Sequence, residues 1–206
     1  MAHLSRRTLL TTSLGALASA AIASRIQGAS PCDSATATAT LVPKGEPGTP
    51  LTVSGCIFRP DGETPAEGAI LYVYQTDLTG LYSPNRAGGP RLRGYLKTGA
   101  DGRYSFRTIR PAPYPEGTIP AHIHTQLWGR DVPPQWNLDL LFEDDPLVPA
   151  ADRTASRAAG RFANVRPAVA NASGVLEVTL NLRIKPKATR FEGGIRHGLE
   201  ACGISV

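Results

Sequence analysis

Apolar residues alternate with polar ones in several short stretches of the chain, and turn residues separate these stretches. The stretches are "LTVSGCIF" (51–58), "AILYVYQTD" (69–77), "AHIHTQLWG" (121–129), "QWNLDLLF" (135–142) and "VLEVTLNLRI" (175–184). A period of two is typical of strands that bury one face of a sheet. Each stretch is therefore predicted to form a β-strand.

The segment "RGYLKTGADGRYSFRTI" (93–109) holds two more predicted strands, one on each side of a Gly-Ala-Asp-Gly turn. Two alternating runs joined by such a turn predict a β-hairpin. Only residues 146–161 have a composition that suits a helix, and that helix would be short. The chain is therefore expected to be all-β: an antiparallel β-sandwich with long loops and at most one short helix.

The composition agrees with one domain of this class. Hydrophobic residues make up 41% of the 206 residues and charged residues 19%, which are ordinary values for folded domains. The 21 Gly and 18 Pro suit a fold rich in turns. The net charge of +5 comes from scattered Lys and Arg rather than from a basic run, so nucleic acid is not an expected partner.

The first residues have the layout of an export signal. "SRRTLLTTSLGALASAAIAS" (5–24) contains an Arg pair, then an apolar stretch, then small residues. Residues 1–23 are therefore predicted to be a twin-arginine-like signal peptide, with a general secretory signal as the alternative. We expect export to the periplasm or the cell exterior, with no stable membrane insertion once the signal is removed.

The remainder divides by composition into three parts. Residues 24–50 are rich in Ala, Thr, Ser, Pro and Gly and are expected to form an extended arm or linker. Residues 51–184 hold the predicted sandwich, and residues 185–206 form a tail without clear periodicity. In an oxidising compartment Cys32, Cys56 and Cys202 allow one disulfide and one remaining thiol, and the sequence does not select the pair.

Candidate chemistry begins with the histidine pair in the predicted strand 121–129. Residues two apart on a strand point to the same face and lie about 7 Å apart along the chain. His122 and His124 could therefore converge on one metal ion. Two hydrogen-bonded histidines in a half-buried strand explain the pair equally well.

Two tyrosines precede this strand in loops. Tyr114 lies in "RPAPYPEGTIP" (110–120), where four prolines stiffen the segment that leads to the histidines. Such a stiff loop is suited to aiming one phenol. Tyr82 follows a predicted strand and, taken alone, would be an ordinary turn tyrosine.

Three segments together resemble the intradiol ring-cleavage dioxygenases, the group of catechol 1,2-dioxygenase and protocatechuate 3,4-dioxygenase. They are "GAILYVYQTDLTGLYS" (68–83), "LRGYLKTGADGRYSFRTIRPAPYP" (92–115) and "PAHIH" (120–124), and the similarity extends over roughly 51–148. The resemblance implies non-haem Fe(III) bound by Tyr82, Tyr114, His122 and His124. Two anionic phenolates favour ferric iron, and imidazole suits iron as well.

The resemblance also implies a reaction. A small aromatic diol would chelate the iron, and Tyr114 would act catalytically by leaving the metal and taking a substrate proton. Both atoms of O₂ would enter the ring between the hydroxyls, giving a cis,cis-muconate-type diacid. Members of the family form dimers and larger assemblies, so a homo-oligomer is a further expectation.

The sequence departs from the family pattern at the expected substrate pocket. Ile119 stands where members commonly have Arg, and a Gln expected on the next strand maps near Asp139. Arg93, Arg110 and Arg130 are candidates for the missing cation, and the sequence selects none of them. Two alternatives therefore stay open, namely a non-catalytic transthyretin-like binding module and an iron-binding relic with an altered pocket.

Overall fold

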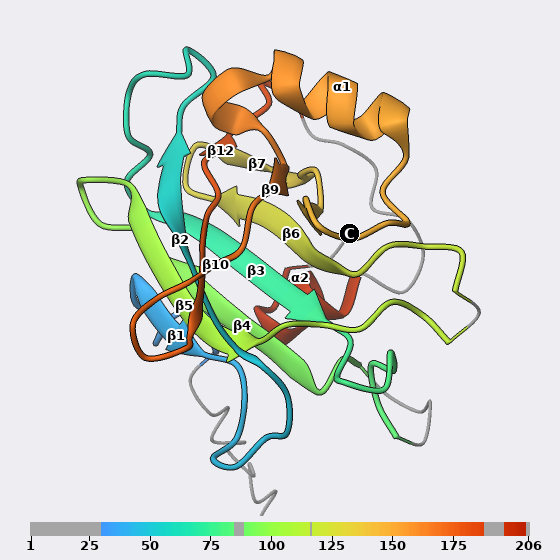
Figure 1. Ribbon diagram of the computed structural model, residues 1–206. Coiled ribbons are helices and arrows are strands. Elements are labelled where there is room, and N and C mark those ends of the chain that lie inside the picture. Colours follow the sequence, from blue (N-terminus) through green and yellow to red (C-terminus); the bar gives the residue numbers. More distant parts are fainter. Residues whose placement is uncertain (1–29, 85–88, 116, 188–195, 205–206) are drawn as a thin grey trace, which may run out of the picture.

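Two β-sheets pack face to face around one core in the computed structural model (Figure 1). The structure describes residues 30–84, 89–115, 117–187 and 196–204. The first sheet contains β1 (Thr38–Thr40), β2 (Pro50–Phe58), β5 (Arg103–Ile109), β10 (Val169–Ala170), β11 (Leu176–Thr179) and β12 (Leu182–Arg183). The second contains β3 (Ala69–Gln75), β4 (Leu92–Lys97), β6 (His122–Gly129), β7 (Val132–Trp136), β8 (Leu140–Phe142) and β9 (Val165–Arg166). The predicted all-β sandwich is confirmed.

The core between the sheets follows the alternation seen in the sequence. Val53 and Ile57 of β2, Phe106 of β5, and Ile123 and Leu127 of β6 all lie in it, and each is at most 1% exposed. Alternate residues of one strand face the same side of its sheet, so the positions between them face outward. On β6 those outward positions carry His122 and His124.

The outward face of the second sheet is covered as well. The helix α2 (Arg196–Ala201) lies behind this sheet in Figure 1, and its Leu199 packs with Tyr72 and Trp128. A side chain in place of Gly198 would meet the ring of Tyr72 at 2.6 Å, so only glycine allows the helix to come this close. A disulfide between Cys32 and Cys202 fastens the end of α2, which settles the pairing that the sequence left open.

The prediction of a β-hairpin over residues 93–109 is wrong. Among the described strands β4 pairs with β3 alone, whereas β5 pairs with β1 and β2 in the other sheet. The Gly99–Gly102 turn forms as expected, with the amide of Gly102 donating to the carbonyl of Gly99 at 3.0 Å. The connection crosses between the sheets because both strands bury their apolar residues in the same core, Leu96 from one side and Phe106 from the other.

The sheets are not antiparallel throughout. β11 and β12 run parallel to β2, β1 runs parallel to β5, and β9 runs parallel to β8. The single strand expected over 175–184 is interrupted between β11 and β12, where the side-chain oxygen of Asn181 accepts a hydrogen bond from the amide of Cys56 at 3.1 Å. The side chain thereby replaces a backbone partner at the break.

The helix expected within 146–161 is α1 (Ala150–Ala158), followed by a short 3₁₀ turn, η1 (Gly160–Phe162). The described part of the arm, from residue 30, contributes β1 and the buried Leu41. The predicted signal peptide, residues 1–23, lies outside the described residues. Within the described residues, no helix has the length and apolar character needed to cross a bilayer.

Candidate metal centre

The structure brings together all four residues that the sequence singled out as metal ligands. The phenol oxygen of Tyr82 lies 2.7 Å from Nε2 of His124 and in direct contact with the phenol oxygen of Tyr114. Nε2 of His122 lies 3.0 Å from Nε2 of His124 and 3.3 Å from the Tyr114 oxygen. Four potential donor atoms from two loops and one strand therefore converge on one point.

The two histidines are placed by the middle of the second sheet. β6 pairs with β3 on one side, with Tyr74 opposite His124, and with β8 on the other. The ring of Tyr74 stacks on His124 with 4.4 Å between centroids, and Trp136 meets the same ring edge-on at 5.1 Å. His122 is 6% exposed and His124 8%, so both rings are held by packing on several sides.

Hydrogen bonds on the far side of each ring fix the tautomers. Nδ1 of His122 lies 2.7 Å from the carbonyl of Pro120, and Nδ1 of His124 lies 2.9 Å from a carboxylate oxygen of Asp139. A carbonyl and a carboxylate can only accept, so each Nδ1 carries the proton and each Nε2 presents a lone pair. The two Nε2 lone pairs lie 3.0 Å apart and repel each other unless an electrophile lies between them. This arrangement suits a bound cation.

Asp139 is the functional residue whose role the sequence analysis missed. The strand predicted over 135–142 is in fact split into β7 and β8, and Asp139 lies in the break. Its backbone carbonyl accepts from the side chain of Asn164 at 2.8 Å. Its carboxylate lies within 4.8 Å of the histidine nitrogens, yet it bonds to Nδ1, the atom turned away from the phenols. Asp139 is therefore placed to orient His124 rather than to bind the same ion.

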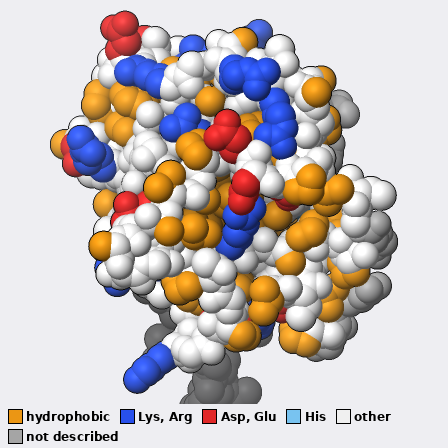
Figure 2. Space-filling model, viewed as in Figure 1, with side chains coloured by type: hydrophobic (Ala, Val, Ile, Leu, Met, Phe, Trp, Pro, Cys, Tyr) orange, Lys and Arg blue, Asp and Glu red, His pale blue; other side chains and the backbone are white. Residues whose placement is uncertain are grey.

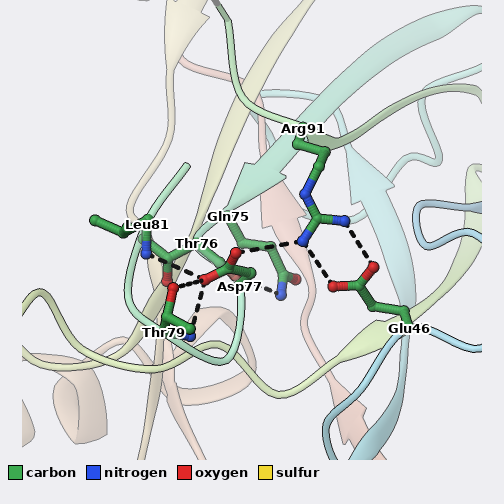
Figure 3. Close-up of polar contacts among 7 residues, drawn as sticks. All are labelled: Glu46, Gln75, Thr76, Asp77, Thr79, Leu81 and Arg91. Carbon is green, nitrogen blue, oxygen red and sulfur yellow. Dashed lines mark hydrogen bonds and ion pairs between the residues drawn. The ribbon is translucent and has the colours of Figure 1, made fainter. Parts of the chain in front are cut away.

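The loop that carries Tyr82 is held by a set of polar contacts around Asp77 (Figure 3). One oxygen of Asp77 accepts from the amide and hydroxyl of Thr79 at 2.8 and 2.6 Å and from the amide of Leu81 at 3.3 Å. Arg91 donates to the other oxygen at 3.3 Å and binds Glu46 with two bonds of 2.6 and 2.7 Å. The amide of Arg91 also donates to the carbonyl of Tyr82 at 2.8 Å.

The same loop is joined to the proline-rich loop that carries Tyr114. The hydroxyl of Thr76 donates to the carbonyl of Ala112 at 2.7 Å, and the amide of Ala112 donates to the carbonyl of Asp77 at 3.2 Å. Gly80 has a φ of +78°, and a Cβ there would lie 2.2 Å from the carbonyl oxygen of Pro113. Only glycine permits this approach, so the two tyrosines are positioned by one packed unit.

Burial sets the protonation of the cluster in the absence of a cation. It raises the pKa of Tyr82, to which the hydrogen bond that Tyr82 donates to Tyr114 adds, and it also raises the pKa of Tyr114. Burial, together with the neighbouring His124, lowers the pKa of His122 and favours the neutral ring. Both phenols therefore keep their protons until a strongly charged ion displaces them.

The donor set fits a non-haem iron ion. Two donors that bind one transition metal at about 2.0–2.2 Å, roughly at right angles, lie about 3 Å from each other. The contacts between the two imidazoles and the two phenols are of this size. Phenolates are hard, anionic donors, and imidazole is a common iron ligand.

A cavity of about 510 Å³ opens beside these donors. Tyr114, His122 and His124 form one wall, and side chains of α1 form another. Ile119 also lines the cavity and is 46% exposed. Tyr82 is absent from the lining, so Tyr114 is the phenol that faces the cavity.

None of the three arginines considered as replacements for the missing cation lines this cavity. Arg93 donates to the carbonyl of Pro90 at 2.7 Å. Arg110 forms two bonds of 2.7 Å with Asp144 and lies over the ring of Phe142. Arg130 lines a different hollow beside the disulfide.

Comparisons with known proteins find similarity to dioxygenases. The sequence model of a family described as Dioxygenase matches residues 26–186. The chain is 34% identical over 122 residues to catechol 1,2-dioxygenase 1 of Acinetobacter lwoffii, covering 48% of this chain and 38% of that protein. It is 31% identical over 128 residues to the protocatechuate 3,4-dioxygenase beta chain of Burkholderia cepacia, covering 54% and 52%. The chain thus spans about half or less of the length of these relatives.

A solved structure is similar over more of its length. It is the dioxygenase domain of a dioxygenase–carbohydrate-binding protein fusion from the cellulolytic bacterium Streptomyces sp. SirexAA-E. The identity is 30% and the TM-score 0.55, with 73% of this chain and 87% of that chain covered. Catechol 1,2-dioxygenase from Acinetobacter sp. ADP1, at 22% identity and a TM-score of 0.57, shares the fold.

Proposed function

This chain belongs to the dioxygenase family whose sequence model matches residues 26–186, and on that premise we propose that it is an intradiol ring-cleavage dioxygenase. The proposed cofactor is non-haem Fe(III), held by Tyr82, Tyr114, His122 and His124. The proposed substrates are O₂ and a catechol-type aromatic, and the proposed product is a cis,cis-muconate-type diacid. One observation carries the proposal: two phenols and two imidazole lone pairs converge beside an open cavity.

Ferric iron in this position would supply a Lewis acid that draws electron density from a bound catecholate and opens its ring to O₂. The protein supplies the orientation of both imidazoles, through the carbonyl of Pro120 and the carboxylate of Asp139. It also supplies a rigid Tyr82, whose loop is fastened through Asp77 and Arg91. These residues hold the donors in place while substrate enters.

Tyr114 is proposed to act on the substrate proton. It is the phenol that lines the cavity, and its oxygen makes the longer of the two phenol–imidazole contacts, 3.3 Å against 2.7 Å for Tyr82. Burial raises the pKa of this phenol, so a free Tyr114 oxygen would be a base strong enough to accept a catechol proton. Tyr82, which lies behind it, is proposed to remain a ligand throughout.

The alternative of a transthyretin-like binding module shares the sandwich but gives no reason for this convergence of donors. The alternative of an iron-binding relic keeps the donors and differs only in turnover. We also propose that the protein is exported, by the twin-arginine route. The disulfide between Cys32 and Cys202 supports this proposal, because such bonds persist in oxidising compartments.

Iron loading and oxygen uptake test the proposal together. Purified protein supplied with Fe(III) should become reddish through tyrosinate charge transfer and should consume O₂ with a catechol. Tyr82→Phe and Tyr114→Phe should each change the colour and reduce the rate severely, and His122→Ala should do the same. Tyr95→Phe, a change on the same sheet away from the donors, is the matched control.

Each of the main alternatives predicts a different result. Protein that stays colourless with added iron would eliminate the metal centre. Coloured protein that takes up no O₂ over a panel of substituted catechols would identify the relic. Retention of both colour and rate in the two Tyr→Phe variants would show that the ligands are assigned wrongly.

A further inference from the structure

The cavity beside the candidate metal centre carries charge of one sign. Apart from the donors Tyr114, His122 and His124, the ionisable side chains among its described lining residues are Asp139 and Asp152, and none is Lys or Arg. The chain as a whole has 22 Lys and Arg against 17 Asp and Glu. Figure 2 shows basic and acidic side chains interleaved over the visible face, so an acid-only lining is not a general property of the surface.

Arg110 and Arg153 direct their donors to groups outside the cavity lining. Arg110 is paired with Asp144 through two bonds of 2.7 Å. Arg153 of α1 donates to the backbone carbonyls of Glu143, Val148 and Asp145. Either arginine could neutralise a carboxylate on a bound ligand only if these contacts broke.

Most of the uncharged lining is apolar, and the polar groups of Ser156 and Asn164 in it are bonded to backbone atoms. Ile119 is 46% exposed and Leu138 58%, and both line the cavity. They are two of the four large apolar side chains that are exposed among the described residues. Ala155 and Ala159 of α1 add small apolar side chains to the same wall. A ligand that covered this surface with its own apolar group would remove it from water.

We propose that the site selects catechols with an uncharged, apolar ring substituent and discriminates against catechols that carry a carboxylate. This selectivity rests on the proposed function, because the iron would hold the diol end of the ligand. Two like charges separated by about 7 Å, at an effective dielectric constant of about 20, repel each other strongly enough to weaken binding roughly fiftyfold. Screening by salt reduces this, and we expect about a tenfold preference at physiological ionic strength.

A matched pair of ligands isolates the charge. 4-Propylcatechol and 3-(3,4-dihydroxyphenyl)propanoate have side chains of the same length, and only the second ends in a carboxylate. Ferric-loaded protein is titrated with each under anaerobic conditions, and the dissociation constants are taken from the change in the charge-transfer absorbance. We expect the propyl compound to bind at least tenfold more tightly, with the difference shrinking as salt is added.

Three variants locate the cause of the preference. Asp152→Asn removes one charge from the cavity wall and should reduce the preference several-fold. Ile119→Arg adds a cation at the mouth and should reduce it at least tenfold. Asp131→Asn makes the same charge change at an exposed residue that does not line this cavity, and it should leave the ratio unchanged.

The outcomes separate this inference from the function on which it rests. If added Fe(III) produces no charge-transfer band, the proposed function fails and the selectivity fails with it. If the band forms and responds to both ligands, yet the carboxylate compound binds as tightly as the propyl compound, the selectivity alone is overturned. A preference that neither Asp152→Asn nor Ile119→Arg changes would also overturn it, because its cause would then lie elsewhere.

Discussion

Removal of the Asp77 side chain should loosen the loop that carries Tyr82 and weaken iron binding. Asp77→Ala removes three hydrogen bonds to one carboxylate oxygen and one from Arg91 to the other. A hydrogen bond to a charged group contributes about 1.5–3 kcal/mol, and bonds that share one acceptor are not additive. We expect a loss of about 2–4 kcal/mol in the free energy of unfolding.

The effect on iron follows from what the loop holds. Arg91, which donates to Asp77, also donates its amide to the carbonyl of Tyr82 at 2.8 Å. Loss of the groups that orient a metal ligand typically lowers metal affinity about 10- to 100-fold. Urea unfolding of the metal-free protein measures the first effect, and titration with Fe(III) followed by the charge-transfer band measures the second.

Asp61→Ala is the matched control. The Asp61 carboxylate accepts from the amides of Glu63 and Thr64 at 2.8 and 2.9 Å and from the Thr64 hydroxyl at 2.6 Å. These bonds all lie within the loop between β2 and β3. This variant should leave iron affinity within about twofold of the original protein. The reasoning is refuted if Asp77→Ala lowers stability but binds iron normally. It is also refuted if both variants lose iron affinity equally.

Three further predictions concern the scaffold. The hydrogen bond from Arg91 lowers the pKa of Glu46 below its ordinary 4.5. This pair should therefore stabilise the fold above that pH and lose its contribution as the pH falls through the folded-state pKa. Between about pH 6 and pH 3, the urea midpoint of Arg91→Ala should fall less than that of the original protein. Reduction of the Cys32–Cys202 disulfide, which spans 170 residues, should lower the free energy of unfolding by about 2–5 kcal/mol, and a melting curve that reductant leaves unchanged would contradict this. Gly80→Ala should lower both thermal stability and iron affinity, because its Cβ would meet a carbonyl oxygen at 2.2 Å with φ at +78°; a variant with normal iron affinity would show that the two tyrosine loops are not coupled there.

The alternation of apolar and polar residues predicted the features that depend on neighbouring residues in the sequence. The alternation along residues 121–129 placed His122 and His124 on one face of a strand, and the structure has them there. The position of Tyr82 and Tyr114 beside them came from the family resemblance, since nothing in two separate loops states that their phenols meet. The structure supplies that reason in the contacts that join the loops.

Features that depend on distant segments could not be predicted in the same way. A turn such as Gly99–Gly102 has the same sequence whether it joins strands of one sheet or of two, and the partner strands decide between them. The role of Asp139 depended on a break in a predicted strand, where the carboxylate turns toward His124. The disulfide joins residues near opposite ends of the chain, and three cysteines alone allow three pairs.

The range of sequence that each feature spans has a consequence for the order of folding. The donors are close in sequence, because Tyr82 and His124 are only 42 residues apart. The closing contacts are not: Asn181 meets Cys56 across 125 residues, and the disulfide closes 170. Contacts between distant segments form more slowly than local ones, because a larger loop must close first. We therefore expect the metal-binding segment to assemble before the C-terminal strands and the disulfide lock it, so that a nascent chain could capture its ion before the last strand is in place.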